Sequence, residues 1–228
     1  MGAFNSLVAA TVLFVGAHFL LTSHPVRTAM VEKFGKLFLG FEVLVYLLSF
    51  LWMLTAYGNA PYYELWPSAD WTRLVPAVVM PFAFVLAVAG LTTRSPTAVG
   101  LEDLARERNP APGILRITRH PVLWGVTLWA LSHLLVNGDL ATVVMIGGIL
   151  LLSVGGMLHI DSRREKALGA DWGPMKLTTS VLPFAAIATG RTTMDWKGLG
   201  WWRPVLGLLF FVAFVVGHEA LIGVSSAP

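Results

Sequence analysis

Cysteine is absent from the 228 residues of this sequence, and charged residues are scarce. The lack of cysteine excludes disulfide bonds and thiolate metal sites, and it leaves the redox compartment undetermined. Asp, Glu, Lys and Arg together make up 13% of the chain, whereas an ordinary soluble domain has about 25%. The composition therefore lies outside the usual range of soluble domains.

Apolar residues form 56% of the chain, and its mean hydropathy is +0.70. A bilayer core about 30 Å thick requires about 20 apolar residues per helix. No segment alternates with the period of two that barrel strands need. The sequence therefore predicts one all-α domain over residues 1–228, a polytopic membrane helix bundle of about six transmembrane helices. The candidate spans are Phe4–Leu21, Leu37–Tyr57, Leu74–Thr92, Pro121–Val136, Leu140–His159 and Pro204–Val224.

The placement of the basic residues predicts the orientation of this bundle. Fifteen of the sixteen Lys and Arg residues fall in three stretches, 22–36, 93–120 and 160–203, and Arg73 is the exception. By the positive-inside rule these stretches face the cytoplasm and both termini lie outside. The first span lacks the basic start of a signal peptide, so we expect it to remain as a helix. The net charge of +3 is explained by topology, so we expect no nucleic-acid partner.

Two of the basic stretches are longer than ordinary connectors, which indicates functional or disordered loops. Residues 97–108 show helical spacing before a break at 109–113, and residues 180–187 form an apolar run too short to span. We therefore expect interfacial segments on the cytoplasmic side, with 180–187 in the interface or re-entering. On the outer side, residues 57–72 are rich in Tyr and Trp. An aromatic belt is the preferred interpretation, and a stacking platform for a ligand is the alternative.

Three histidines, His18, His133 and His218, fall inside apolar spans. Ionisable groups in a bilayer are costly, so each indicates a functional site, with an interhelical hydrogen bond as the alternative. Two imidazoles from facing helices can ligate haem, and a third nearby would suit zinc. At 1.5 Å per residue, His133 lies about 18 Å and His218 about 21 Å above the inner face, and His18 about 6 Å. Depth therefore favours the pair His133 and His218.

A second group of candidates lies at the inner interface, in the residues before Pro121. Arg116, Arg119 and His120 could hold a lipid phosphate or an anionic group of a ligand, or they could be ordinary interfacial cations. His159 stands at the predicted end of its span, where a cation caps the helix favourably. Glu42, inside another span, could orient a ligand imidazole or reach the interface.

Several motifs in order resemble the NnrU family of bacterial membrane proteins and the related 15-cis-zeta-carotene isomerases. They are RITRHP (116–121), WALSH (129–133), DSRREKALGADW (161–172), TTSVLPFAAI (178–187) and GHE (217–219). The resemblance implies a multi-pass protein of the bacterial inner membrane that supports denitrification, through the production of active nitrite and nitric oxide reductases. It also implies haem b, held axially by His18 and His133. We keep His218 as the reserve ligand.

The isomerase relatives further imply a hydrophobic polyene substrate and an isomerase-like haem chemistry. Their second haem histidine follows, by three residues, a cysteine that serves as an alternate ligand, and Ala130 stands there in this chain. Alanine cannot ligate iron, so that ligand switch is missing here. The absence of a Cys-x-x-Cys-His motif means that haem would be bound without a covalent link. Membrane lipid and a nitrogen-oxide reductase subunit are the remaining expected partners.

A weaker resemblance connects the RITRHP and ALGADW stretches with isoprenylcysteine and phospholipid methyltransferases. It implies an S-adenosylmethionine site at the cytoplasmic surface, formed by Arg119, His120, Arg163, Arg164 and Glu165. A non-catalytic assembly factor for a reductase is the third hypothesis.

Overall fold

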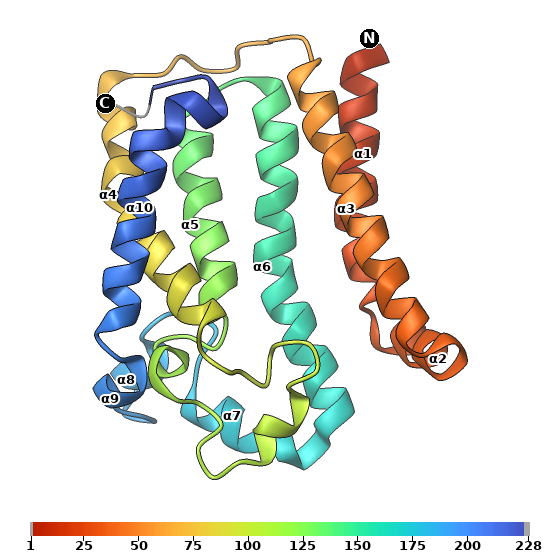
Figure 1. The fold of residues 1–228 in the computed structure, drawn as a ribbon, viewed down its shortest axis with the longest axis vertical. Helices are drawn as coiled ribbons and strands as arrows, with labels where there is room; N and C mark the ends of the chain where they lie inside the picture. The colour runs from red at the N-terminus through yellow and green to blue at the C-terminus, as the bar shows by residue number, and fades with distance from the viewer. Residues whose placement is uncertain (1, 226–228) are drawn as a thin grey trace.

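The computed structural model describes residues 2–225, and in that range it is a helical bundle (Figure 1). The only β geometry among these residues is an isolated bridge between Glu64 and Asp139. The bundle confirms the predicted fold class. Its six long helices are α1 (Gly2–Leu21), α3 (Lys36–Gly58), α4 (Asp70–Leu91), α5 (Pro121–Val136), α6 (Leu140–Leu168) and α10 (Trp202–Ile222).

In the described range five of these helices are long and apolar enough to cross a membrane, and α5 is a shorter apolar helix. With 16 residues, α5 is about 24 Å long. It begins at Pro121, whose fixed φ suits the first turn of a helix and whose missing N–H costs nothing there. The chain is therefore a multi-pass membrane protein.

Both chain ends lie at one end of the bundle, and the short helices gather at the other (Figure 1). We call these ends the terminal side and the basic side, since the three basic stretches all lie on the second. The short elements of the basic side are α2 (His24–Phe34), η1 (Glu102–Arg106), η2 (Gly113–Arg116), η3 (Gly169–Trp172), α7 (Gly173–Thr178), α8 (Ala185–Ala188) and α9 (Trp196–Leu199).

Within the bundle, α5 packs between α4 and α6, α10 packs on α4, and α1 packs on both α3 and α6. Small residues allow the close approaches, as is usual for helices in lipid. A Cβ on Gly125 of α5 would lie 2.7 Å from the carbonyl oxygen of Ala83 in α4. A Cβ on Gly207 of α10 would lie 2.7 Å from Cα of Val85. Glycine is therefore required where α5 and α10 meet α4.

The long basic-side segments have a hydrophobic core of their own. It joins the end of α4 to residues of η1, η2, η3 and α7, among them Leu115, Trp172 and Met175, which are at most 1% exposed. Burial of large side chains provides the free energy that orders a loop. These segments are thus packed structure, which decides against the disordered interpretation of the long loops.

Two local predictions need correction. Helix α6 continues to Leu168, so His159 lies inside it and the prediction of a terminal cap was wrong. The charged residues that follow His159 end the apolar run but are good helix formers. Of residues 97–108, which have helical spacing, only the five residues of η1 form a helix. Residues 180–187 include the start of α8, and their place in the interface stays a prediction. Helix α2 was not predicted.

Candidate functional site

A cavity of about 830 Å³ lies between α4, α5 and α10 at the terminal side. Its volume is in the range of small-molecule sites. Its walls are mostly aromatic and aliphatic, and its polar side chains lie near the terminal-side end. The lining residues include Tyr62, Trp66, Arg73, Met80, Phe84, Trp129, His133, Phe211, Phe214 and His218.

Aromatic contacts and the loop before α4 form this cavity. The Phe84 ring lies 5.2 Å from that of Phe214 and 6.1 Å from that of Phe211. The loop closes over the end of α5 through a hydrogen bond from the Leu65 amide to the Gly138 carbonyl, 2.7 Å long. Trp66 lies in this loop and lines the cavity, so an aromatic residue of the outer loop forms part of the cavity wall.

His133 and His218 both line this cavity, from α5 and α10. His133 Nδ1 lies 2.8 Å from the Trp129 carbonyl oxygen, and His218 Nδ1 lies 2.8 Å from that of Val224. A carbonyl only accepts, so Nδ1 carries the proton in each neutral ring. The remaining nitrogen, Nε2, then has a free lone pair, which is the tautomer that a metal-ligating histidine needs.

His18 lies elsewhere, at the basic-side end of α1. Its Nδ1 also faces a carbonyl oxygen, that of Phe14 at 2.7 Å, so its tautomer is the same. Its ring stacks on Tyr46 of α3, with centroids 3.8 Å apart and planes at 17°. His18 does not line the cavity that holds His133 and His218. The structure thus brings together the pair that depth favours, and it places the histidine favoured by family resemblance near the opposite end of the bundle.

The donor set fits haem better than zinc. In the part of the chain that the structure describes, three or more His, Asp or Glu side chains nowhere come close enough to hold a metal ion together. A histidine zinc site needs a third ligand, whereas haem takes two axial imidazoles and packs its faces on apolar side chains. Arg73 is exposed and lines the same cavity, where it could bind an acidic group of a ligand.

On the basic side, Arg119 and His120 share one carboxylate. Arg119 Nε donates to Asp161 at 2.8 Å, and His120 Nε2 lies 2.9 Å from the other oxygen. Arg119 also donates to Thr179 at 3.2 Å. Because both basic side chains are buried, these bonds anchor the start of α5 to α6. The donors that a ligand would need are thus occupied by the protein itself.

Arg116 is similarly engaged. Its guanidinium donates to the carbonyl oxygens of Ala111 and Thr193 and to the side chains of Asn109 and Thr192. The same region is tied together by Asp195, whose carboxylate accepts from the amides of Gly113 and Gly198, each at 2.9 Å. These two amides hold the pKa of Asp195 below its ordinary value. The hydrogen bonds of Arg116 therefore join η2 to the segment before α9.

The two motifs that resemble the NnrU family most clearly lie against each other. The Arg119 amide donates to the Ser180 carbonyl at 3.0 Å, and the Phe184 amide donates to the Ile117 carbonyl at 2.8 Å. Thr118 Oγ1 and Trp124 Nε1 both donate to the Val181 carbonyl oxygen. The RITRHP and SVLPF segments are therefore one structural unit beneath α5.

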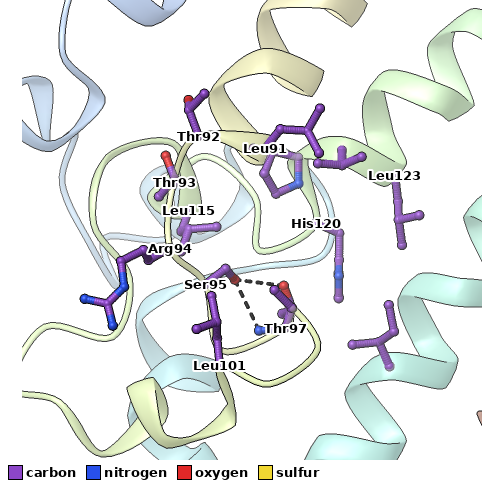
Figure 2. A pocket seen from close by; sticks show the side chains of 15 residues that line it. Leu91, Thr92, Thr93, Arg94, Ser95, Thr97, Leu101, Leu115, His120 and Leu123 are labelled. Atoms are coloured by element: carbon purple, nitrogen blue, oxygen red, sulfur yellow. Dashed lines mark hydrogen bonds between the residues drawn. The ribbon is translucent and has the colours of Figure 1, made fainter. Parts of the chain in front are cut away.

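A second cavity, of about 330 Å³, lies beside this unit (Figure 2). Of the five residues in the S-adenosylmethionine hypothesis, only His120 lines it. Arg164 instead donates to Glu102 at 2.5 Å and to two backbone carbonyls. Burial raises the pKa of Glu102, but its own amide, Arg164 and Arg163 outweigh this and hold that pKa below its ordinary value. The side chains of the predicted cofactor residues thus bond to other parts of the protein and do not meet in one site.

Comparison with known proteins places the chain among membrane proteins of one family. Residues 6–226 match the family model described as "NnrU protein". The chain is 39% identical over 82 residues to the chloroplastic 15-cis-zeta-carotene isomerase of Arabidopsis thaliana, and 39% identical over 79 residues to that of Zea mays. These matches cover 36% and 35% of this chain but only 22% of each isomerase. No solved structure matches.

Proposed function

Because the chain belongs to the NnrU family, we propose that it is a haem b protein that acts on a long apolar ligand in the cavity between α4, α5 and α10. The proposal assigns His133 and His218 as the axial ligands. It gives the aromatic walls the role of holding the porphyrin and the apolar ligand.

One observation carries the assignment. His133 and His218 reach one cavity from two helices, and each has its Nδ1 against a backbone carbonyl. Backbone acceptors hold both rings in the tautomer and orientation that ligation requires, without any further side chain. Arg73 is suitably placed to bind a propionate of the haem.

The isomerase relatives suggest the reaction class, a change of double-bond geometry in a polyene. A cis–trans isomerisation conserves atoms and electrons, so no net oxidant or reductant is required. Bound haem would supply a redox-active iron centre, which no side chain here can provide. The aromatic walls would exclude water and hold an extended apolar molecule.

An absorption spectrum of the purified full chain tests the proposal. We expect a Soret band in the wild-type protein expressed with ample haem precursor. His133→Ala and His218→Ala should each lose or strongly shift this band, because each removes an axial ligand. His24→Ala, which changes an interfacial histidine outside the cavity, should keep the wild-type spectrum.

The family resemblance makes a different prediction for the same experiment. If His18 and His133 are the ligands, His18→Ala loses the band and His218→Ala keeps it. That outcome would retain haem and reject the pair proposed here. A wild-type protein without any Soret band, and without haem binding on titration, would reject haem altogether.

For the cellular setting, we propose the inner membrane of a bacterium, with the basic side in the cytoplasm, and a role in nitrogen-oxide respiration. A strain that lacks the chain should then lose nitrite and nitric oxide reductase activity. Wild-type protein should restore both activities, and His133→Ala should not. If His133→Ala restores both reductase activities fully, the role in nitrogen-oxide respiration does not depend on this cavity.

A further inference from the structure

Where α1, α2, α3 and α6 meet on the basic side, a cluster of ionisable groups lies outside both cavities. We call it the Arg163 cluster. Two residues of α6 one turn apart, His159 and Arg163, both bond to Thr22 at the end of α1. His159 Nε2 lies 3.0 Å from the Thr22 hydroxyl, and Arg163 Nη1 lies 3.5 Å from its carbonyl oxygen. The other members are Arg27, Glu42 and Tyr46.

Arg163 is the anomaly in this cluster. It is 8% exposed, and its Nε is buried without a hydrogen-bond partner. The bond to Thr22 is at the outer limit for an N–H donor. A buried charge normally has a counter-charge and satisfied donors, because its desolvation is costly. Here the guanidinium has neither.

The nearby carboxylates cannot serve as the counter-charge. Both oxygens of Glu42 accept from Arg27, at 2.8 and 2.7 Å. Glu102 accepts from Arg164 at 2.5 Å. Three guanidinium groups thus face two carboxylates, which leaves one positive charge in excess, and the geometry gives that excess to Arg163.

A second donor in the cluster is also unused. The hydroxyl of Tyr46 is buried and has no hydrogen-bond partner. Its ring stacks on that of His18, whose carbonyl oxygen accepts from the hydroxyl of Thr22. An oxyanion would neutralise the excess positive charge and accept hydrogen bonds from the two unsatisfied donors.

We propose that the Arg163 cluster binds an anionic phosphate group at the basic-side surface of the bundle. Two sources share this chemistry, the phosphodiester of an acidic lipid headgroup and free inorganic phosphate. The site is independent of the haem cavity, because it uses other helices and lies on the other side of the bundle. A bound phosphate would join α1 to α6 and neutralise the excess charge.

Thermal unfolding of the full chain in dodecyl maltoside micelles tests this site. Phosphatidylglycerol should raise the unfolding temperature of the wild type by about 3 to 10 °C relative to phosphatidylcholine, as for a new charge-assisted bond. Arg163→Gln should lose this response, or require at least about tenfold more lipid for it. Arg94→Gln, which removes an exposed arginine and therefore the same charge, should respond like the wild type.

Micelles without an acidic lipid provide a further readout. There Arg163→Gln should be at least as stable as the wild type, because it removes an unpaired buried charge. An ordinary ion-paired arginine would show the reverse. Sodium phosphate against sodium chloride at equal ionic strength distinguishes the sources. A response to both phosphate and the lipid indicates a general phosphate site, and a response to the lipid alone indicates a headgroup site.

Two outcomes would overturn the proposal. One is a wild-type unfolding temperature that responds to neither anion. The other is an Arg163→Gln protein that responds as strongly as the wild type. If Arg163→Gln does not fold, Tyr46→Phe decides instead: it removes only the unused hydroxyl, so it should weaken the response, and a full response would contradict the site.

Discussion

Single side chains carry most of the polar stability on the basic side, and Asp161 is the clearest case. Replacing it with asparagine removes the counter-charge of the buried Arg119 and leaves one acceptor oxygen where Arg119 and His120 now use two. We expect Asp161→Asn to lower the free energy of unfolding by about 3–5 kcal/mol. Denaturant unfolding in detergent measures this change.

The matched control for Asp161 is an exposed ion pair in the same region. Asp171 accepts from Arg106 at 2.7 Å, but the two side chains are 45% and 57% exposed. Asp171→Asn should therefore cost about 0–1 kcal/mol. Equal losses in the two variants would show that burial does not govern the strength of these pairs.

Asp195 predicts a dependence on pH. Its pKa lies below the ordinary value in the native state because two backbone amides donate to it. The stabilisation is therefore complete above the unfolded pKa of about 3.9, and it is lost as the pH falls through the lower native pKa. Hydrogen exchange near Gly113 and Gly198 should accelerate in that acid range.

Asp195→Ala should give fast exchange at Gly113 and Gly198 already at neutral pH and should remove the acid-dependent step. Glu107→Gln changes an exposed acid of the same region and should retain the step. A step of the same size in Asp195→Ala would assign the acid sensitivity to another group.

Among the candidate residues, the rise per residue put His133 and His218 at one depth, and both line one cavity in the structure. That any histidine holds haem, as expected for His18 and His133, stays a prediction. The sequence did not predict that Arg116, Arg119 and His120 bond within the protein. Their partners, Asp161, Thr179 and Thr192, lie some 40 to 80 residues away in the chain. Contacts between residues so far apart in the chain cannot be inferred from the spacing of residues in the sequence.

The helices show the same contrast between local and distant signals. Helix α5 was predicted with its observed ends, since Pro121 begins it and Asn137-Gly138 follows it. Helix α2 was missed because its mean hydropathy is low, although Ser23 and Pro25 are a local start signal that could have revealed it. Hydropathy finds the parts of helices that lie in lipid, and α6 continues beyond that part.

Gly125 of α5 lies at the close contact with α4. Gly125→Ala would place a Cβ 2.7 Å from the Ala83 carbonyl oxygen and 3.2 Å from the Ala87 Cβ. We expect a loss of about 1–3 kcal/mol as the two helices separate. Thermal unfolding in detergent measures it.

Gly147 of α6 provides the control for Gly125, because a Cβ there meets nothing within 4 Å. Gly147→Ala should be neutral or more stable by up to about 1 kcal/mol, through its better helix propensity. A destabilised Gly147→Ala would show that glycine in this bundle serves a purpose other than close packing.

The orientation of the complete bundle in the membrane can be tested by cysteine labelling. The wild-type sequence has no cysteine, so only an introduced cysteine reacts. Asn59→Cys on the terminal side should react with an impermeant maleimide in intact cells. Glu107→Cys on the basic side should react only after the cells are broken. The reverse labelling pattern would invert the assignment that the basic residues indicate.

Two groups of helices make up the bundle, α1 to α3 on one flank and α4, α5 and α10 on the other, with α6 between them. This arrangement has a consequence for synthesis. Roughly 80 residues separate the end of α3 from the start of α6, and a ribosome adds about 5–20 residues per second. The hairpin formed by α1 and α3 is therefore in the lipid for about 4 to 16 seconds before α6 is synthesised. During that interval Arg27 and Glu42, which belong to the hairpin itself, already neutralise each other.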